Sequence, residues 1–180
     1  MTSPKRQRAE QYKIVPATRQ HVRAIPGLEQ AAAALFPAED LPAELRYRVT
    51  DNDVLRQAQR QGRLWVALDP SGRAVGFALA EVQEDEARLD EVDVHPLHAR
   101  RGIGTRLVET VIAWAEGRNF PSLSLLTFRH LPWNAPFYER LGFEILEKHE
   151  LSPGLADILG EEALAGINID KRVGMRRMLR

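Results

Sequence analysis

The chain has 180 residues, 44% hydrophobic and 28% charged, which suits one globular domain with a substantial core and excludes a disordered or fibrous protein. Twenty-five basic residues balance 25 acidic ones, so the global positive field of a nucleic-acid-binding protein is not expected. Cysteine is absent and the apolar runs are shorter than the roughly 18 residues of a membrane span, so disulfides and a membrane partner are excluded and a cytoplasmic protein is expected.

The chain divides into a polar start and a long folded part. Residues 1–10 carry Lys5, Arg6 and Arg8 without apolar support, which predicts a disordered basic tail. Residues 11–180 contain no internal repeat and no low-complexity segment, and we expect them to form a single domain.

Helical signals follow a first short strand at 12–15. A helix over 18–35, capped by Thr18, must be interrupted or kinked at Pro26-Gly27 because proline lacks a backbone N–H and clashes with the preceding turn. A second helix is expected over 53–61, between a polar cap and a closing glycine.

Three consecutive antiparallel strands are expected next. Strands at 63–68 and 73–83 flank Asp69-Pro70-Ser71-Gly72, a turn in which proline presets one dihedral angle and glycine accepts another. A charged turn at 84–86 leads into the third strand at 87–94. Its glutamate and aspartate residues make this strand unusual for a sheet with two covered faces.

The second half of the chain alternates helices and strands. Apolar residues recur at helical spacing over 105–117, and the run at 123–128 is apolar without alternation, as in a central strand covered on both faces. A right-handed crossover should make that strand parallel to the one at 87–94. The remaining elements are a short helix after Asn134, a strand at 143–151, a helix at 152–166 and a final strand at 172–179.

The third antiparallel strand leads through a basic, glycine-containing loop into a helix. A helix N-terminus leaves backbone N–H groups unpaired and carries partial positive charge, which suits an anion. The pair Gly102-Ile103-Gly104 lacks the lysine of a Walker loop, and Leu107 stands where a dinucleotide fingerprint needs its third glycine. Arg100, Arg101 and Arg106 lie beside the pair and favour a bound diphosphate.

The sequence VDVHPLHARRGIGTRLV at 92–108 resembles the coenzyme A-binding motif of the GNAT acetyltransferase superfamily. WNAPFYERLGF at 133–143 resembles the short-helix motif that follows it in that family. The resemblance extends over about 11–180 and implies an α/β (α+β) fold, with a mixed, mostly antiparallel sheet of six to seven strands and helices on both faces. It also implies an N-acetyltransferase that moves an acetyl group from acetyl-CoA to an amine by direct attack in a ternary complex.

The resemblance assigns cofactor-binding roles to this strand and loop. The family usually has Gln or Arg where this chain has Ala99, but the pyrophosphate is held mainly by backbone N–H groups, and Arg100 or Arg101 reaches a phosphate. The backbone of Val92 and Val94 would pair with the pantetheine arm, and one of their N–H groups would polarise the thioester carbonyl. The amides implied to bind the pyrophosphate belong to Ala99, Arg101, Gly102, Gly104 and Thr105.

Three further residues are candidates for the chemistry. Tyr138 stands at the family's tyrosine position, where a hydroxyl of pKa about 10 can protonate the departing thiolate; otherwise it is a packed aromatic. Strand alternation places Glu91 and Asp93 on one face about 7 Å apart. One of these two acids accepts the proton of the amine, with Glu91 preferred and Asp93 second. The alternative is that both form salt bridges.

Asn134 is a candidate for cofactor binding. Its side chain either bonds the pantetheine amide or only caps its helix.

The acceptor is not specified by the sequence. We expect a small amine or a peptide N-terminus, with no nucleic acid and no metal, and the family is compatible with a homodimer. His95 is expected to act in a turn, and His130 is a candidate for contact with the substrate. The regions that recognise substrates in this family hold six acids, either an acidic rim for a cationic amine or solvated helix faces: Glu39, Asp40, Glu44, Asp157, Glu161 and Glu162.

Two alternative functions remain open at this stage. A GNAT-like fold can bind an acyl-CoA and act as a sensor or scaffold without catalysis. An enzyme of this fold can also transfer a longer acyl group. Turnover with amines separates the first alternative from an enzyme, and a comparison of acyl chain lengths decides the second.

Overall fold

The computed structural model describes residues 11–83 and 85–180, so the predicted basic tail lies outside the described residues. Hydrogen bonds order seven strands as β1-β2-β3-β4-β5-β7-β6 in one sheet, which confirms the predicted mixed, mostly antiparallel sheet. No helix in the described part is long and apolar enough to cross a bilayer. The chain groups into two compact units, of which the first comprises 11–36, 46–81 and 89–111 and the second 37–45, 82–88 and 112–180.

The first unit contains β1 (Lys13–Pro16), β2 (Leu64–Leu68) and most of β3 (Ala74–Gln83) and β4 (Glu86–Val94). β1 pairs antiparallel with β2, and β2 with β3. The predicted turn between β2 and β3 is confirmed: the Asp69 carboxylate accepts the Ser71 N–H at 2.9 Å, and Gly72 has a φ of 82°. Glycine adopts this left-handed conformation without the steric cost that a side chain would add.

Helices of the first unit are α2 (Arg19–Val22), α3 (Ile25–Ala33), α4 (Asn52–Arg60) and the first half of α5 (Ile103–Gly117). The predicted interruption of the first helix is present, but it falls before Pro26 rather than at Pro26-Gly27. Proline in the first turn of α3 costs nothing, because its missing N–H would have no helical partner there. Asp51 caps α4 by accepting the Asp53 N–H at 2.7 Å.

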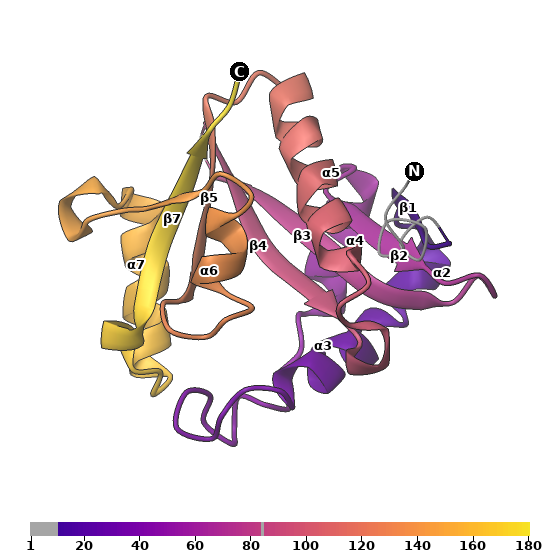
Figure 1. The fold of residues 1–180 in the computed structure, drawn as a ribbon, viewed down its shortest axis with the longest axis horizontal. Helices are drawn as coiled ribbons and strands as arrows, with labels where there is room; N and C mark the ends of the chain where they lie inside the picture. The colour runs from indigo at the N-terminus through magenta and orange to yellow at the C-terminus, as the bar shows by residue number, and fades with distance from the viewer. Residues whose placement is uncertain (1–10, 84) are drawn as a thin grey trace. The chain divides into compact units, whose positions relative to one another are not determined.

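The core of the first unit lies between one face of the strands and helices α2 to α4. Alternation along β2 and β3 turns every second side chain toward these helices, and Figure 1 shows α4 behind β2 and β3. Burial of each large apolar side chain contributes about 1.5–3 kcal/mol. The buried members of this core are Ala17, Val22, Ile25, Leu28, Leu55, Ala58, Leu64, Val66, Phe77 and Leu79.

The second unit contains β5 (Ser122–Phe128), β6 (Glu144–Ile145), β7 (Arg172–Met178), α6 (Ala135–Glu139) and α7 (Pro153–Leu164). The start of β4 pairs with β5 in parallel at Ala87 and Arg88, as the crossover rule predicts. β7 pairs antiparallel with both β5 and β6 and therefore lies between them. In Figure 1 the last strand runs beside β5, although β6 precedes it in the chain.

The predicted strand at 143–151 is wrong in its length. Only Glu144–Ile145 is strand, and Leu146 adds one hydrogen bond from its N–H to the Gly174 carbonyl. The chain then turns into a 3-10 helix, η2 (Lys148–Glu150), because the Glu150 carboxylate accepts the Glu147 N–H at 2.8 Å. A side chain that bonds the local backbone competes with the ladder of a strand.

Candidate active site

The chain leaves β4 through a tight turn that leads into α5. His95 stabilises the 3-10 helix η1 (Pro96–His98), because its Nδ1 accepts the Leu97 N–H at 3.3 Å, which confirms its predicted role in a turn. Arg100 and Gly102 have φ angles of 59° and 77°. Left-handed backbone is costly for arginine and free of that cost for glycine. The turn is therefore a specific local conformation that exposes backbone N–H groups at the start of α5.

Backbone donors at the start of α5 fit an anion. The first helical bond recorded at this end runs from the Arg106 N–H to the Gly102 carbonyl at 3.2 Å. The N–H groups of Gly104 and Thr105 precede it, so they are among those that a helix leaves without an internal acceptor. The Ala99 N–H differs from them, because it already donates within η1 at 3.1 Å. Of the predicted set, Ala99 is thus the residue whose amide already has a backbone acceptor in the described structure.

Tyr12 ties the turn to the first strand. Arg101 Nη1 donates to the Tyr12 hydroxyl oxygen at 2.8 Å, and its Nη2 donates to the Leu97 carbonyl at 3.3 Å. The same hydroxyl lies 3.0 Å from His98 Nδ1. Burial, together with the charge of Arg101, lowers the pKa of His98. The neutral ring can therefore accept a hydrogen bond from the Tyr12 hydroxyl. Arg106 Nη1 completes the contact by donating to the Tyr12 carbonyl at 2.7 Å.

The two arginines predicted to reach a phosphate are in different situations. The Arg101 guanidinium is bonded to Tyr12 and to the backbone of the turn. Arg100 is exposed, and its side chain has no hydrogen-bond partner among the described residues. Arg100 is therefore the better candidate for a phosphate, and Arg101 holds the conformation of the turn.

Glu91 and Asp93 share one face of β4, as alternation predicted, and both are half-buried. Burial, reinforced by the charges of neighbouring acids, raises the pKa of Glu91 to about 10. Burial also raises the pKa of Asp93 to about 7. At neutral pH the pair therefore retains one proton and begins to lose the second. A general base operates in the same pH range.

A third carboxylate, Glu29, belongs to the same group. The Thr50 N–H donates to Glu29 Oε1 at 3.0 Å, and the Thr50 hydroxyl donates to Glu91 Oε2 at 3.4 Å. Sequence reasoning missed both residues, although Glu29 falls at helical spacing among buried Ile25 and Leu28. No group of three or more acidic or histidine side chains in the described part of the chain is placed to hold a metal ion.

The end of β4 is held closely against β3. A side chain at Gly76 would bring its Cβ within 2.8 Å of the Asp93 carbonyl oxygen, and the His95 N–H donates to the Val75 carbonyl at 2.8 Å. Glycine at this position is required by the close approach of the two backbones. The carbonyl and N–H groups around Val94 are thereby fixed in direction.

Tyr138 and Asn134 lie in the second unit. Tyr138 is half-buried in α6, with its ring centroid 5.0 Å from that of Phe137 and 5.8 Å from that of Phe143. Asn134 occupies the N-cap position of α6, as predicted, but its side chain forms no capping hydrogen bond although it is only 8% exposed. The structure therefore does not show the capping role of the asparagine side chain, and its bond to a pantetheine amide stays a prediction.

Two of the six acids, for which either an acidic rim or solvated helix faces were open, are ion-pair partners within the second unit. Asp40 is buried, which alone would raise its pKa, but hydrogen bonds and charges from Lys171 and His130 lower it below the ordinary value. Its carboxylate lies 2.5 Å from Lys171 Nζ and 2.9 Å from His130 Nε2. Glu162 accepts a hydrogen bond from Arg172 Nε at 2.7 Å. His130, a candidate for contact with the substrate, pairs with Asp40 and is otherwise half-exposed.

Comparison with known proteins identifies relatives of part of the chain. A model of the acetyltransferase (GNAT) family matches residues 26–143. The mycothiol acetyltransferase of Nocardiopsis dassonvillei is 36% identical over 109 residues, which are 56% of this chain and 29% of that protein. The ribosomal protein bS18-alanine N-acetyltransferase of Escherichia coli K12 is 33% identical over 88 residues, 48% of this chain and 60% of that protein. The chain thus spans less than two thirds of either relative.

Solved structures extend the likeness of fold to nearly the whole chain. The ribosomal-protein-S18-alanine N-acetyltransferase of E. coli has a TM-score of 0.63 at 20% identity, covering 93% of this chain and 94% of that one. An N-acetyltransferase of Thermoplasma acidophilum in complex with coenzyme A has a TM-score of 0.65 at 12% identity, covering 93% and 98%. Because the family model covers well over half of its residues, the chain belongs to the GNAT acetyltransferase family.

Proposed function

We propose that this protein transfers the acetyl group of acetyl-CoA to an amine acceptor. Family membership supports the reaction class. The observation that carries the proposal is the turn before α5, where Gly102 is left-handed and the N–H groups of Gly104 and Thr105 lack helical acceptors. Such a turn, with the exposed Arg100 beside it, suits a pyrophosphate.

The remaining contacts to coenzyme A follow from the family motifs. Acetyl-CoA supplies the thioester that is cleaved. The backbone of Val92 and Val94 pairs with the pantetheine arm, and one of their N–H groups polarises the thioester carbonyl. Asn134 bonds a pantetheine amide, which is consistent with the missing capping hydrogen bond of its buried side chain. Arg101 acts through its bonds to the turn.

The chemistry needs one proton acceptor and one proton donor. The acceptor ammonium gives up a proton to the ionised Glu91–Asp93 pair, and the neutral amine then attacks the carbonyl carbon, so that a C–N bond forms. As the C–S bond breaks, the nitrogen loses its second proton to water and coenzyme A departs as the thiolate. Asp93 is the better base of the two, because a pKa of about 7 leaves it ionised in much of the protein at neutral pH, whereas Glu91 stays protonated. Tyr138 gives its hydroxyl proton to the departing thiolate.

The acceptor is a small amine or a peptide N-terminus. Two relatives support this range, since one is named for the alanine of a ribosomal protein and the other for mycothiol. The two alternatives, a catalytically inactive acyl-CoA sensor and a transferase of longer acyl groups, are separated from this proposal by the experiment that follows.

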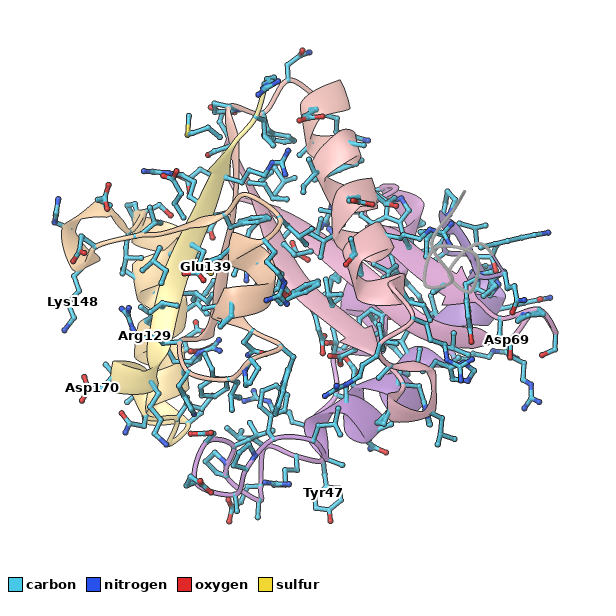
Figure 2. All side chains as sticks on the ribbon, viewed as in Figure 1. Tyr47, Asp69, Arg129, Glu139, Lys148 and Asp170 are labelled. Atoms are coloured by element: carbon cyan, nitrogen blue, oxygen red, sulfur yellow. The ribbon has the colours of Figure 1, made fainter. Side chains whose placement is uncertain are left out.

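Substitution of Tyr138 by Phe tests the proposed acid. We expect kcat to fall by roughly 10²–10⁴, the usual contribution of a positioned acid, while the Kd for acetyl-CoA stays unchanged. Tyr47→Phe is the matched control, because Tyr47 is 77% exposed and its side chain projects from its loop (Figure 2). Turnover is measured against a panel of amines with acetyl-, propionyl- and butyryl-CoA.

Each outcome of this panel has a distinct meaning. Acetylation by the wild type with a large loss in the Tyr138→Phe variant supports the proposal. Binding of acetyl-CoA without turnover of any amine would favour the sensor, and faster transfer from butyryl-CoA would favour the longer acyl group. Full activity of Tyr138→Phe would remove tyrosine from the mechanism.

A further inference from the structure

One carboxylate oxygen of Glu29 is buried and accepts no hydrogen bond from the described residues. Its residue is 5% exposed, and Oε2 has no hydrogen-bond partner among the described residues. The other oxygen accepts the Thr50 N–H at 3.0 Å. A buried carboxylate oxygen without a partner is costly, so proteins rarely retain one without a use.

Glu29 is linked to the Glu91–Asp93 pair through Thr50. Thr50 is bonded to Glu29 through its N–H and to Glu91 through its hydroxyl, so one residue connects the two carboxylates. The charge of Glu29 also acts on both Glu91 and Asp93 and raises the pKa of each. Three carboxylates from α3 and β4 therefore converge inside the first unit.

We propose that Glu29, with Glu91 and Asp93, binds the ammonium group of the acceptor and selects a primary amine whose neighbouring carbon carries no free carboxylate. This inference rests on the proposed acetyl transfer and narrows its substrate class. It favours a peptide N-terminus, an amino amide or a simple alkyl amine over a free α-amino acid.

Charge and hydrogen bonding both support this selection. A primary ammonium has three N–H donors and a positive charge, and it would satisfy the free Glu29 oxygen while relieving repulsion among the carboxylates. A free α-amino acid carries a carboxylate two bonds from the ammonium, which adds negative charge to a site that already has three acids. Like charges at short range in a partly buried site repel strongly.

Binding of a cation should also displace protons from the carboxylates. The acidic groups that act on Glu91 are Asp93, Glu29 and Asp90, and Thr50 is the neutral partner that bonds it. A bound ammonium lowers the pKa of each neighbouring carboxyl, so the pair releases part of a proton when the acceptor binds at pH 7. A neutral ligand in the same place would release none.

Calorimetry with glycinamide and glycine tests the proposal. The two probes share a primary amine and differ only in an amide or a carboxylate beside it. Each probe is titrated into the full chain saturated with coenzyme A, which carries no acetyl group and so prevents turnover. Glycinamide should bind roughly tenfold or more tightly than glycine. The apparent enthalpy for glycinamide should differ between phosphate and HEPES buffer at pH 7, because protons are released and neither buffer is a primary amine.

The Glu29→Gln variant isolates the charge of Glu29. Glutamine keeps an oxygen that can accept the Thr50 N–H, so the local fold is preserved. We expect the Kd for glycinamide to rise about ten- to a hundredfold, the preference over glycine to shrink, and the KM for acetyl-CoA to stay unchanged. Glu109→Gln is the matched control, because Glu109 is exposed on α5.

Either of two results would overturn the proposal: equal affinity of the wild type for glycinamide and glycine, or equal affinity of the wild type and Glu29→Gln for glycinamide. Absence of measurable glycinamide binding to the wild type would also overturn it. Acetylation of amines by the wild type is measured in parallel. Turnover without this charge selection would refute the ammonium site alone, whereas a lack of turnover with every amine would refute the proposed function.

Discussion

Asp93 and Glu91 are placed where a carboxylate is unfavourable to the fold and useful for proton transfer. Burial raises the pKa of Asp93 to about 7 and that of Glu91 to about 10, so the folded chain holds their protons more tightly than the unfolded chain. This tighter proton binding adds to the free energy of unfolding, and the addition is complete when the pH is below the ordinary pKa values of 3.8 for aspartate and 4.5 for glutamate. It is lost as the pH rises through about 7 and then about 10.

Proton transfer by this pair should make catalysis depend on pH. We expect kcat/KM to rise with pH through an apparent pKa of about 7 and then to level off, because the pair loses its first proton there. Asp93→Asn should remove this limb and lower kcat by about a hundredfold or more. Glu91→Gln should retain most of the activity, since Glu91 acts as a neutral group at pH 7.

Rates are compared with one acceptor across pH 5 to 9. The acceptor amine also titrates, and its effect on the pH–rate profile is the same for the wild type and Asp93→Asn. Only the difference between the two profiles therefore reports on groups of the enzyme. An unchanged profile in Asp93→Asn, together with its loss in Glu91→Gln, would show that Glu91 is the base.

At the scale of elements, the turn between β4 and α5 depends on a residue far from it in the chain. Tyr12 lies just before β1, yet its hydroxyl and carbonyl bind Arg101, His98 and Arg106. Removal of the hydroxyl leaves the Arg101 guanidinium and the His98 nitrogen without this partner. The N–H groups proposed to bind the pyrophosphate should then be less well fixed.

Tyr12→Phe should therefore weaken coenzyme A binding about five- to tenfold, the equivalent of one ordinary hydrogen bond. The exposed Tyr47, replaced in the same way, provides a control that removes a hydroxyl without such contacts (Figure 2). Binding is measured by calorimetry with coenzyme A. If the Tyr12→Phe variant bound coenzyme A as tightly as Tyr47→Phe, the turn would not depend on this contact.

Much of this architecture could be predicted from local signals. The turn at Asp69 to Gly72, the cap at Asp51 and the strand, loop and helix around Gly102 depend on neighbours within a few residues. Strand alternation likewise predicted the shared face of Glu91 and Asp93. The insertion of β7 between β5 and β6 was not predicted, because nothing local specifies which strands pair across a long connection.

The partners of buried charges were harder to predict. Asp40 pairs with Lys171, 131 positions away, and Glu29 meets Glu91 through Thr50. Sequence patterns show which helix face is apolar, but they do not show which distant side chain completes an ion pair. For that reason the sequence predicts either an acidic rim or a solvated helix face for Asp40, whereas this residue is buried within the second unit.

At the scale of the whole molecule, three elements are shared between the compact units, and the first of them, β3, is divided after Glu81. β4 contributes Glu86–Arg88 to the second unit and Leu89–Val94 to the first, and α5 is divided after Val111. A strand or helix cannot lose one half without weakening hydrogen bonds in the other, since helix formation is cooperative.

We therefore predict a single cooperative unfolding transition, in agreement with the expectation of one domain over 11–180. Calorimetric and van't Hoff enthalpies should be equal. Acetyl-CoA at about 100 times its Kd should raise the free energy of unfolding by about 2.7 kcal/mol without splitting the transition. Two resolved transitions, of which coenzyme A shifted only one, would show that the units unfold independently.

The proposed acetyl transfer is tested most directly by mass spectrometry of the products. Incubation of the purified chain with acetyl-CoA and a primary amine such as glycinamide should yield the N-acetylated amine and free coenzyme A in equal amounts, and Tyr138→Phe should yield little of either. Coenzyme A release without an acetylated amine, or tight binding of acetyl-CoA with no product from any amine of the panel, would contradict the account.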